Sequence, residues 1–325
     1  MTNISRPIPV LATEHQARTG REARNPSQMA VYGFNKGDKP MIKLRHLPLL
    51  AAAFAAMPAW AQDVPASAAA PSPEELTSRD TLTVAVGGAM IPDYEGSDDY
   101  RFIPAAGFRG QYHGFSFATR GLYLYLDAIP ENGSKIEFDA GPMVGVRFNR
   151  TRNKLKDDVV DLLPVKKTAI EAGVFAGVTI HGVTNPYGAL AFRVDVFHDF
   201  ASAHKSTIVS PNIDFSTPLS QRTFVSASAG LEFVSNKFAD YYFSIDPAES
   251  LVTGLPTFNA GGGMKNWKAG LLLNQSLTGN LLHGLSAFGT ANYSRLVGDF
   301  KRSPIVSIRG SANQWLFAAG LAYTW

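Results

Sequence analysis

Two pairs of neighbouring residues could take part in acid–base chemistry. Asp98 and Asp99 form an acidic pair, and His198 and Asp199 form a histidine–carboxylate pair. If the pairs met in the fold, a water molecule held between them could be activated, because a histidine near neutral pH can take its proton. The sequence holds no Gly-x-Ser-x-Gly nucleophile elbow and no His-Glu-x-x-His metal motif. Catalysis therefore depends on whether the elements that carry the two pairs bring them together.

An acidic stretch and five scattered histidines are the other candidate ligands. The acidic stretch consists of Asp93, Glu95, Asp98 and Asp99. Its carboxylates could hold a divalent cation or contact ions that bridge lipopolysaccharide, and the alternative is a solvated loop. The histidines have no ligand spacing; they are His113, His181, His198, His204 and His283. We expect no catalytic residue, no metal site and no cofactor.

The composition of the chain excludes several classes of protein. The chain has 325 residues, of which 45% are hydrophobic and 18% charged, and it has no cysteine. Disulfides, thiolate zinc sites and cysteine nucleophiles are thereby excluded. Residues 1–61 hold eight Lys and Arg against three Asp and Glu, whereas residues 62–325 carry a net charge of −2. The main part of the chain therefore does not predict a nucleic-acid partner.

The first 79 residues are expected to lie outside the folded domain. From Met41 a short basic segment, an apolar run and the small residues Ala59 and Ala61 follow one another, which is typical of a signal peptide over 41–61 cleaved before Gln62. Residues 1–40 do not fit a signal peptide, and we interpret them as a non-native upstream extension or a disordered leader. Residues 62–79 are rich in Ala, Pro and Ser and predict a flexible periplasmic linker. A single domain is expected over 80–325.

The remaining chain alternates between apolar and polar residues with a period of two. Within 135–149, one parity is apolar at seven positions, while the other is polar or small. The same pattern recurs in segments of 10–15 residues, which are longer than most strands of soluble proteins. An exported chain without an apolar helix can cross a membrane only as a closed barrel. The pattern therefore predicts an all-β, closed antiparallel transmembrane β-barrel whose apolar face contacts lipid.

About twelve strands are expected, with ten as the alternative. The expected ranges are 80–90, 100–112, 115–126, 135–149, 168–182, 187–200, 203–216, 222–235, 238–246, 265–276, 284–297 and 312–325. An even number places both termini in the periplasm. The outward connections are then 91–99, 127–134, 183–186, 217–221, 247–264 and 298–311. In this topology His198 lies a membrane thickness away from Asp98, which argues against catalysis.

Polar residues of the inward parity and one long connection are the other candidate sites. The inward charges could line a narrow pore, but we expect them to pair across strands and occlude the lumen; they are Arg109, Glu137, Asp139, Arg147, Glu171, Arg193, Asp195 and Glu232. The connection 150–167 is expected on the periplasmic side as either a partner surface or a solvated loop. Its basic residues are Arg150, Arg152, Lys154, Lys156, Lys166 and Lys167.

The last strand carries the expected assembly signal. Its outward residues include Phe317, Leu321, Tyr323 and the terminal Trp325. The last strand must add to a sheet edge before a barrel closes. A terminal aromatic residue is suited to the membrane interface, since its ring has an apolar body and a polar tip. We expect the barrel-assembly machinery to bind this segment.

Three stretches of the chain resemble the MipA/OmpV family of outer-membrane proteins, named for the MltA-interacting protein. They are residues 91–101 (IPDYEGSDDYR), residues 250–256 (SLVTGLP) followed by a glycine run, and residues 303–315 (SPIVSIRGSANQW). The resemblance covers about 80–325. It implies an outer-membrane barrel of a Gram-negative bacterium, without known catalysis, in contact with membrane lipid and lipopolysaccharide.

The resemblance also implies candidate functions. The role that gave the family its name is a scaffold that bridges a lytic transglycosylase and a penicillin-binding protein in peptidoglycan synthesis. Other members are described as adhesins or are linked to osmotic or drug responses. A small pore and a surface adhesin acting through the extracellular loops therefore remain the alternatives to a cell-wall scaffold.

Overall fold

A computed structural model describes residues 80–325, which form one closed antiparallel barrel of twelve strands. The predicted fold class is thereby confirmed. The strands are β1 (Thr81–Pro92), β2 (Tyr100–Tyr112), β3 (Phe115–Arg120), β4 (Tyr123–Leu126), β5 (Ile136–Arg147), β6 (Ala169–His181), β7 (Ala189–Asp199), β8 (Thr207–Pro218), β9 (Thr223–Val234), β10 (Gly263–Ser276), β11 (Gly284–Leu296) and β12 (Asn313–Thr324). The signal peptide, the linker and the residues Ala59, Ala61 and Gln62 lie outside the described residues.

The apolar parity of each strand faces outward. On β12, Trp315, Phe317 and Leu321 are between 41% and 47% exposed, whereas the alternate residue Ala322 is buried. On β5, Phe138 is 66% exposed. A soluble protein would bury such side chains, so the exposed apolar surface is that of a barrel in lipid.

The barrel closes between its first and last strands. β1 pairs with β12 over eight residues, from Thr83 opposite Thr324 to Met90 opposite Phe317. A Cβ on Gly87 would lie 2.1 Å from the carbonyl oxygen of Ala319. Glycine is therefore needed there for the two backbones to approach each other closely.

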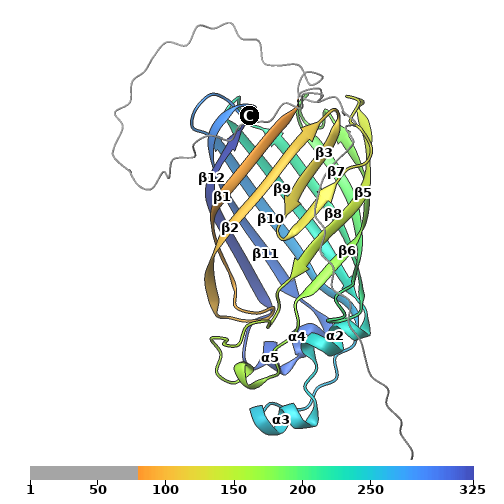
Figure 1. The fold of residues 1–325 in the computed structure, drawn as a ribbon, viewed down its shortest axis with the longest axis vertical. Helices are drawn as coiled ribbons and strands as arrows, with labels where there is room; N and C mark the ends of the chain where they lie inside the picture. The colour runs from red at the N-terminus through yellow and green to blue at the C-terminus, as the bar shows by residue number, and fades with distance from the viewer. Residues whose placement is uncertain (1–79) are drawn as a thin grey trace, which may run out of the picture. The chain divides into compact units, whose positions relative to one another are not determined.

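Short helices cover one end of the barrel, and the C-terminus lies at the other end (Figure 1). The helices are the 3-10 helix η1 (Val160–Leu162), α2 (Asn236–Phe243), α3 (Pro247–Thr253), α4 (Gly298–Arg302) and α5 (Pro304–Ser307). We call this end the capped end and the other the terminal end. None of the helices in residues 80–325 is long and apolar enough to cross a membrane.

The terminal end has the shorter connections, such as the two-residue turn between β2 and β3 and the four-residue turn between β8 and β9. The long connections lie at the capped end. Outer-membrane barrels keep short turns in the periplasm and longer loops outside the cell. We therefore assign the terminal end to the periplasm and the capped end to the exterior.

Two of the predicted strands were wrong, and their errors compensate in the count. Segment 115–126 is not one crossing strand but the hairpin β3–β4, which turns back at Gly121 and Leu122. Segment 238–246 is largely the helix α2, because Phe238 and Tyr242 are fully buried at a spacing of four residues, which is a helical period. These two side chains belong to an apolar cluster formed by the helices and loops at the capped end. The alternating pattern gave no sign of this cluster.

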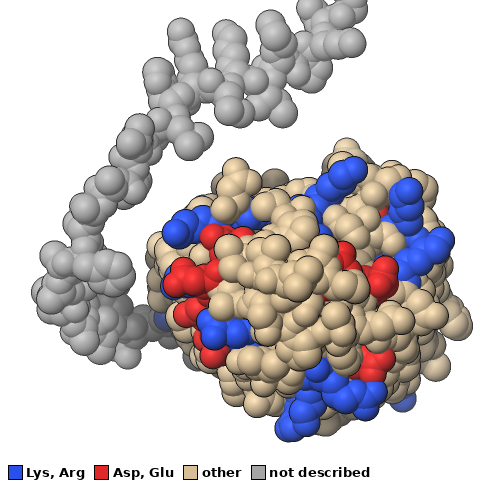
Figure 2. Space-filling model, turned by 90° about the horizontal axis from the view of Figure 1, so that it is seen from below, with Lys and Arg blue, Asp and Glu red and all other residues tan. Residues whose placement is uncertain are grey.

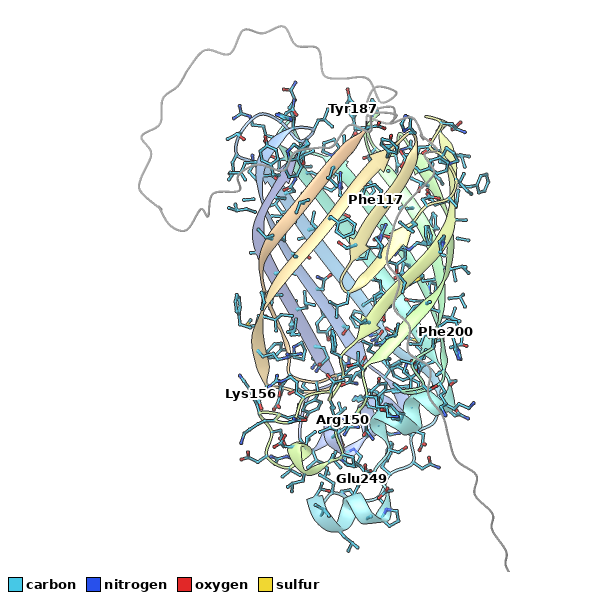
Figure 3. All side chains as sticks on the ribbon, in the orientation of Figure 1. Phe117, Arg150, Lys156, Tyr187, Phe200 and Glu249 are labelled. Atoms are coloured by element: carbon cyan, nitrogen blue, oxygen red, sulfur yellow. The ribbon has the colours of Figure 1, made fainter. Side chains whose placement is uncertain are left out.

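Because of these two errors, every strand between the two segments runs in the direction opposite to the predicted one. Connections 127–134, 183–186 and 217–221 were predicted outside but lie at the terminal end, because β5 starts where the β3–β4 hairpin returns. The ribbon shows the same arrangement, with Tyr187 at one end and Glu249 at the other (Figure 3). Connections 91–99, 247–264 and 298–311 lie at the capped end as predicted.

Candidate functional site

The lumen of the barrel is the largest concentration of paired charges in the described chain. Ion pairs and hydrogen bonds cross it in three layers that follow one another from the capped end to the terminal end. The cap and middle layers join strands that are not neighbours in the sheet, whereas the third layer joins the neighbouring strands β5 and β6. The layers decide whether the barrel can act as a pore.

The cap layer lies directly beneath the helices. Arg147 of β5 contacts Glu171 of β6 at 2.9 Å and Glu232 of β9 at 3.4 Å. Lys265 of β10 contacts Glu232 at 2.8 Å and forms an ion pair with Glu95 of the β1–β2 loop. The side chain of Lys265 is 1% exposed. Two cations thus contact three carboxylates, which come from two strands and one loop.

Neighbouring side chains complete the hydrogen bonds of the cap layer. Nε2 of His204 lies 2.9 Å from Oε1 of Glu171, and both side chains are fully buried. Tyr123 of β4 donates its hydroxyl proton to the same carboxylate. The ring of Phe238 on α2 lies 5.1 Å from Nζ of Lys265 and 5.3 Å from the guanidinium carbon of Arg147. The cap and the barrel are therefore joined through one buried network.

The middle layer is built around Tyr125 of β4. Its hydroxyl donates to Asp195 at 3.1 Å, and Arg193 contacts the same carboxylate at 2.8 Å. Arg193 also reaches Asp214 of β8 at 3.3 Å, and Arg120 reaches Asp214 at 3.5 Å. Arg120 and Tyr125 come from the hairpin, so the side chains of its short strands, which lie in the barrel wall, help to fill the lumen.

The third layer lies toward the terminal end. His181 pairs with Glu137 at 2.9 Å, and Thr179 donates to Asp139 at 2.7 Å. Glu131, in the loop before β5, accepts a hydrogen bond of 3.3 Å from the amide of Gln111. Of the eight charges predicted to face the lumen, Arg109 makes no ion pair within 4.0 Å among residues 80–325. The other seven lie in the three layers.

Burial, together with the neighbouring carboxylates of Glu137 and Asp139, raises the pKa of Glu131 to about 7. An unfolded glutamate titrates near about 4.3. The folded state therefore retains this proton between the two values while the unfolded state loses it. We expect the free energy of unfolding to fall as pH rises from about 4.5 to about 7, and then to level off.

Glu131→Gln should remove this fall in the free energy of unfolding between about pH 4.5 and about pH 7, since the amide does not titrate. Denaturant unfolding in detergent at a series of pH values measures it, with the exposed-helix variant Glu249→Gln as the control. An unchanged slope in Glu131→Gln would show that this carboxyl is not the source.

The cap seals the lumen with apolar side chains. Residues of the β1–β2 loop, the 148–168 connection and the helices share one buried cluster that includes Tyr94, Leu155, Val160, Phe243 and Phe300. The hydroxyl of Tyr94 donates to the carbonyl oxygens of Ile305 at 3.2 Å and Arg309 at 3.0 Å. Its pKa is raised, chiefly by burial. The capped end is thus a small hydrophobic core, closed to solvent.

Arg150 fixes the long connection to this core. Its side chain is buried and donates to the carbonyl oxygen of Tyr242 at 2.8 Å. Burial lowers the pKa of Arg150 to about 10. The Arg150 residue itself has a φ of 53°, in the left-handed region. The connection therefore packs against α2 as a built part of the cap.

The prediction that connection 150–167 faces the periplasm was wrong. Arg150 and Lys156 lie at the capped end, beside Glu249 and far from Tyr187 (Figure 3). Arg152 pairs with Asp93 at 2.7 Å, and Lys156 donates to the carbonyl oxygen of Tyr100 at 2.5 Å. The connection lies at the end opposite to the predicted one because the β3–β4 hairpin does not cross the membrane. Seen from the capped end, Lys and Arg side chains lie among Asp and Glu side chains on this face (Figure 2).

Two carboxylates of the acidic stretch contact cationic side chains. The side chain of Asp93 is fully buried and pairs with Arg152, while Arg101 lies 3.7 Å away. Glu95 pairs with Lys265. Two of the four carboxylates are therefore neutralised by side-chain cations, and residues 80–325 contain no cluster of three potential metal ligands.

The histidine–carboxylate pair lies at the same end as Asp98 and Asp99, not a membrane thickness away as predicted. Its contacts are nevertheless structural. His198 contacts the hydroxyl of Thr207 at 2.9 Å, and Asp199 accepts hydrogen bonds from the backbone of Ala201, His204 and Lys205. Asp199 thus shapes a loop and does not orient His198.

Several residues of the network escaped the sequence analysis. Lys265, Tyr123, Tyr125 and His204 were not assigned to the lumen, because they lie near strand ends or in loops where the alternation is interrupted. Two tyrosines at a spacing of two, following Arg120 and Gly121, are the signal that could have shown a short hairpin with an inward face.

The predicted assembly residues lie on the outer face of β12 or just beyond it. Phe317, Leu321 and Tyr323 are half-exposed, and the ring of Tyr323 lies 4.6 Å from that of Trp325. The backbone N–H of Trp325 donates to the carbonyl oxygen of Leu82 at 3.0 Å. The end of the chain is thereby attached to the first strand.

Comparison with known proteins gives one family and several barrels. The family model described as "MltA-interacting protein MipA" matches residues 84–325. The fold is similar to the NanC porin, with a TM-score of 0.40 and 8% identity over 74% of this chain and 98% of that one. It is also similar to the translocator domain of the autotransporter NalP from Neisseria meningitidis, with a TM-score of 0.32 and 14% identity over 75% and 87% of the two chains.

A third similar structure is the toluene transporter TodX of Pseudomonas putida, with a TM-score of 0.31 and 9% identity over 78% of this chain and 91% of that one. Among curated proteins, none matches the chain.

Proposed function

The chain belongs to the MltA-interacting protein MipA family and is an outer-membrane β-barrel, and from this premise we propose that it is a scaffold, not a pore or an enzyme. The scaffold would hold a peptidoglycan-cleaving lytic transglycosylase, together with a peptidoglycan-synthesising penicillin-binding protein, at the inner surface of the outer membrane. The family name supports the first partner. The ion pairs within the lumen and the apolar core of the cap carry the proposal, because they favour a role for the surfaces of the barrel over passage through it.

The periplasmic surface most suited to a partner is formed by two turns that are bonded together. The turn after β8 and the turn after β10 are joined by Leu281 N–H to Gln221 O at 3.0 Å and Ser276 N–H to Arg222 O at 2.7 Å. Leu219 in the first turn is 65% exposed, and Leu277 in the second is 50% exposed. Exposed leucines in two joined turns, one of which also carries Arg222, have the composition of a protein interface.

The adhesin is the second candidate, and one observation favours it. Helix α3 protrudes from the capped end, with none of its residues buried (Figure 1). Leu251 is 88% exposed and Val252 is 62% exposed. Exposed apolar side chains on an external projection can contact another surface.

One matched pair of variants separates the two functions. We expect Leu219→Asp to reduce capture of lytic transglycosylase and penicillin-binding protein by the purified barrel about tenfold or more, since a central hot-spot contact is worth about 2 kcal/mol or more. Leu251→Asp, the same change at the opposite end, should leave capture unchanged. The measurement is pull-down at physiological salt.

The opposite pattern would favour the adhesin: unchanged enzyme capture in Leu219→Asp, with loss of host-cell or matrix binding in Leu251→Asp. Failure of the wild-type barrel to capture either enzyme would contradict the scaffold.

The sealed lumen also predicts the electrical behaviour of the protein. We expect flat current traces when the wild-type barrel is inserted into a planar lipid bilayer, because the cap core and the ion-paired layers leave no open path. A porin inserted under the same conditions provides the positive control. Stable conductance steps from the wild-type barrel would contradict the proposal and support the pore.

A further inference from the structure

A groove with a volume of about 520 Å³ lies in the outer wall of the barrel, where β10, β11, β12 and β1 are neighbours (Figure 1). Its floor consists of small outward residues: Gly88, Gly289, Ala291 and Ala319. No atom lies within 4 Å of the position that a Cβ on Gly289 would occupy, so the floor is open to the surroundings. The volume falls within the range of about 300–1,000 Å³ that is usual for small-molecule sites.

Larger apolar side chains border the groove on both sides of β11. Leu271 and Leu273 of β10 lie on one side, and Phe317 of β12 lies on the other. Ala291 is opposite both Leu271 and Phe317, and its small side chain keeps the groove open between them. The groove therefore runs along β11 toward the capped end.

Three aromatic rings lie between the groove and the capped end. Tyr293 of β11 contacts Trp315 of β12 at 4.8 Å and Trp267 of β10 at 5.2 Å between ring centroids. Such a group of aromatic rings marks a membrane interface. Because the capped end faces the exterior, the groove lies in the half of the membrane that the outer leaflet occupies.

An exposed cation lies at the capped end of the same strand. Arg295 is two residues beyond Tyr293 and therefore continues the outward parity of β11. Its side chain is exposed, and none of the carboxylates in residues 80–325 pairs with it within 4.0 Å. Ala291 is four residues away, which is about 13 Å at the usual rise of a strand. A fatty-acyl chain can span this distance, so one lipid can contact both the groove and the guanidinium.

We propose that the groove and Arg295 form a binding site for one lipid of the outer leaflet, lipopolysaccharide. One of its fatty-acyl chains lies along β11 in the groove, and a phosphate of its head binds Arg295. A guanidinium can donate two parallel hydrogen bonds to a phosphate, which favours an anionic head over a neutral one. Trp267 and Trp315 adjoin the boundary between the head and the chains, where indole rings are favoured.

The groove favours a chain at one fixed place over ordinary contact with the wall. In lipid, apolar surfaces gain nothing from leaving water, so association depends on packing. A chain on a smooth wall contacts protein on one side only. A chain in the groove contacts the floor at Gly289 and the side chains of Leu271 and Phe317, and each close pair of atoms adds a small attraction. The bound chain is therefore held more tightly than the surrounding lipid.

A second copy of the barrel is a poorer occupant of the groove. Phe102 is 77% exposed, and its ring lies across Gly88, since a Cβ on that glycine would lie 2.1 Å from Cζ of the ring. Leu271, on the other side, is 57% exposed. These side chains hold the convex wall of another barrel away from the floor, and packing in lipid needs close contact. A flexible chain can enter between them.

Matched variants test the groove and the cation separately. Ala291→Leu fills the groove, whereas Ala176→Leu makes the same change at an outward position of β6, on another side of the barrel. Arg295→Gln removes the cation, and Lys167→Gln removes another exposed cation at the capped end, next to β6. Gly289→Leu serves as the second filling variant if Ala291→Leu fails to fold, which heat-modifiable gel mobility shows.

The probe is lipid A, the phosphorylated and acylated part of lipopolysaccharide. Native mass spectrometry of each purified full-length barrel in detergent measures the bound fraction over a range of lipid A concentrations. We expect Ala291→Leu to weaken binding at least about fivefold and Arg295→Gln at least about tenfold, since the first loses packing and the second loses charge-assisted hydrogen bonds. Ala176→Leu and Lys167→Gln should bind like the wild type.

Dephosphorylated lipid A checks the position of the head. The wild-type barrel should bind it as weakly as Arg295→Gln binds lipid A, because in both cases the pair of guanidinium and phosphate is missing. Arg295→Gln should bind the dephosphorylated lipid no more weakly than the wild type does. A further loss in that variant would contradict a contact between Arg295 and the phosphate.

Wild-type binding of lipid A by a folded Ala291→Leu or Gly289→Leu barrel would overturn the proposal. Equal weakening by Arg295→Gln and Lys167→Gln would show a general effect of charge and would overturn the assignment of the head. A wild-type dimer that Ala291→Leu converts to a monomer would show that a second copy occupies the groove, which overturns the proposal as well. None of these results depends on capture of cell-wall enzymes, so failure here leaves the scaffold proposal standing.

Discussion

Replacing Lys265 by methionine should lower the free energy of unfolding by about 3–5 kcal/mol, the usual cost of removing one partner from a buried ion pair. The ammonium group of Lys265 is 1% exposed and contacts Glu95 and Glu232. Methionine fills the space but removes one of the two cations that contact the three carboxylates of the cap layer, Glu95, Glu171 and Glu232. Because Glu95 belongs to the β1–β2 loop, the cap should loosen together with the barrel.

Lys268→Met on the same strand is the matched control. Nζ of Lys268 has one hydrogen bond, of 3.1 Å, to Oγ of Ser210. Its loss should cost about 1 kcal/mol, as expected for a single hydrogen bond. Denaturant unfolding in detergent micelles measures both variants. Equal destabilisation by the two changes would show that the cap layer has no special role.

Replacing Tyr323 by aspartate should strongly reduce the amount of folded barrel in the outer membrane. Tyr323 is opposite Val84 of β1 and Leu285 of β11, so it lies at the seam where the barrel closes. Its ring faces outward beside Trp325. A charge near the membrane interface costs only about 0–1 kcal/mol in a finished barrel. A large loss would therefore come from assembly and not from stability.

Tyr112→Asp tests that distinction. Tyr112 is an exposed aromatic residue at the same end of β2, away from the last strand. It should show only the small interfacial cost and assemble normally. Heat-modifiable mobility on gels and membrane fractionation measure both variants, and deletion of Trp325 should behave like Tyr323→Asp. Normal folded levels after either change to the last strand would contradict an assembly signal there.

The lipid-facing surface was predictable from the sequence because it depends on neighbours along one strand. Each outward side chain of β5 or β12 is two residues from the next, and this period can be read directly. The same reading failed for segment 238–246. Its tyrosines and phenylalanines fit a strand in isolation, and they form a helix because the cap core buries one side of it.

The charged residues of the lumen were predictable as a set, but their partners were not. Arg147, Glu171 and Glu232 have the inward parity in the sequence, yet the distance of 85 residues between Arg147 and Glu232 gives no sign that they meet. Register and closure of the barrel bring them together. Lys265 could not be paired at all, because its partner Glu95 lies in a loop 170 residues away.

By itself the sequence determined that the chain forms a barrel with an apolar exterior and a terminal aromatic residue, because these properties follow from alternation within single strands. Only the tertiary structure decided which end carries connection 150–167, since one hairpin that fails to cross the membrane reverses all the strands that follow. The same hairpin leaves half of the β2 edge unpaired and fills the lumen with Arg120 and Tyr125. Strand direction and edge pairing are properties of the whole sheet, and no local pattern specifies them.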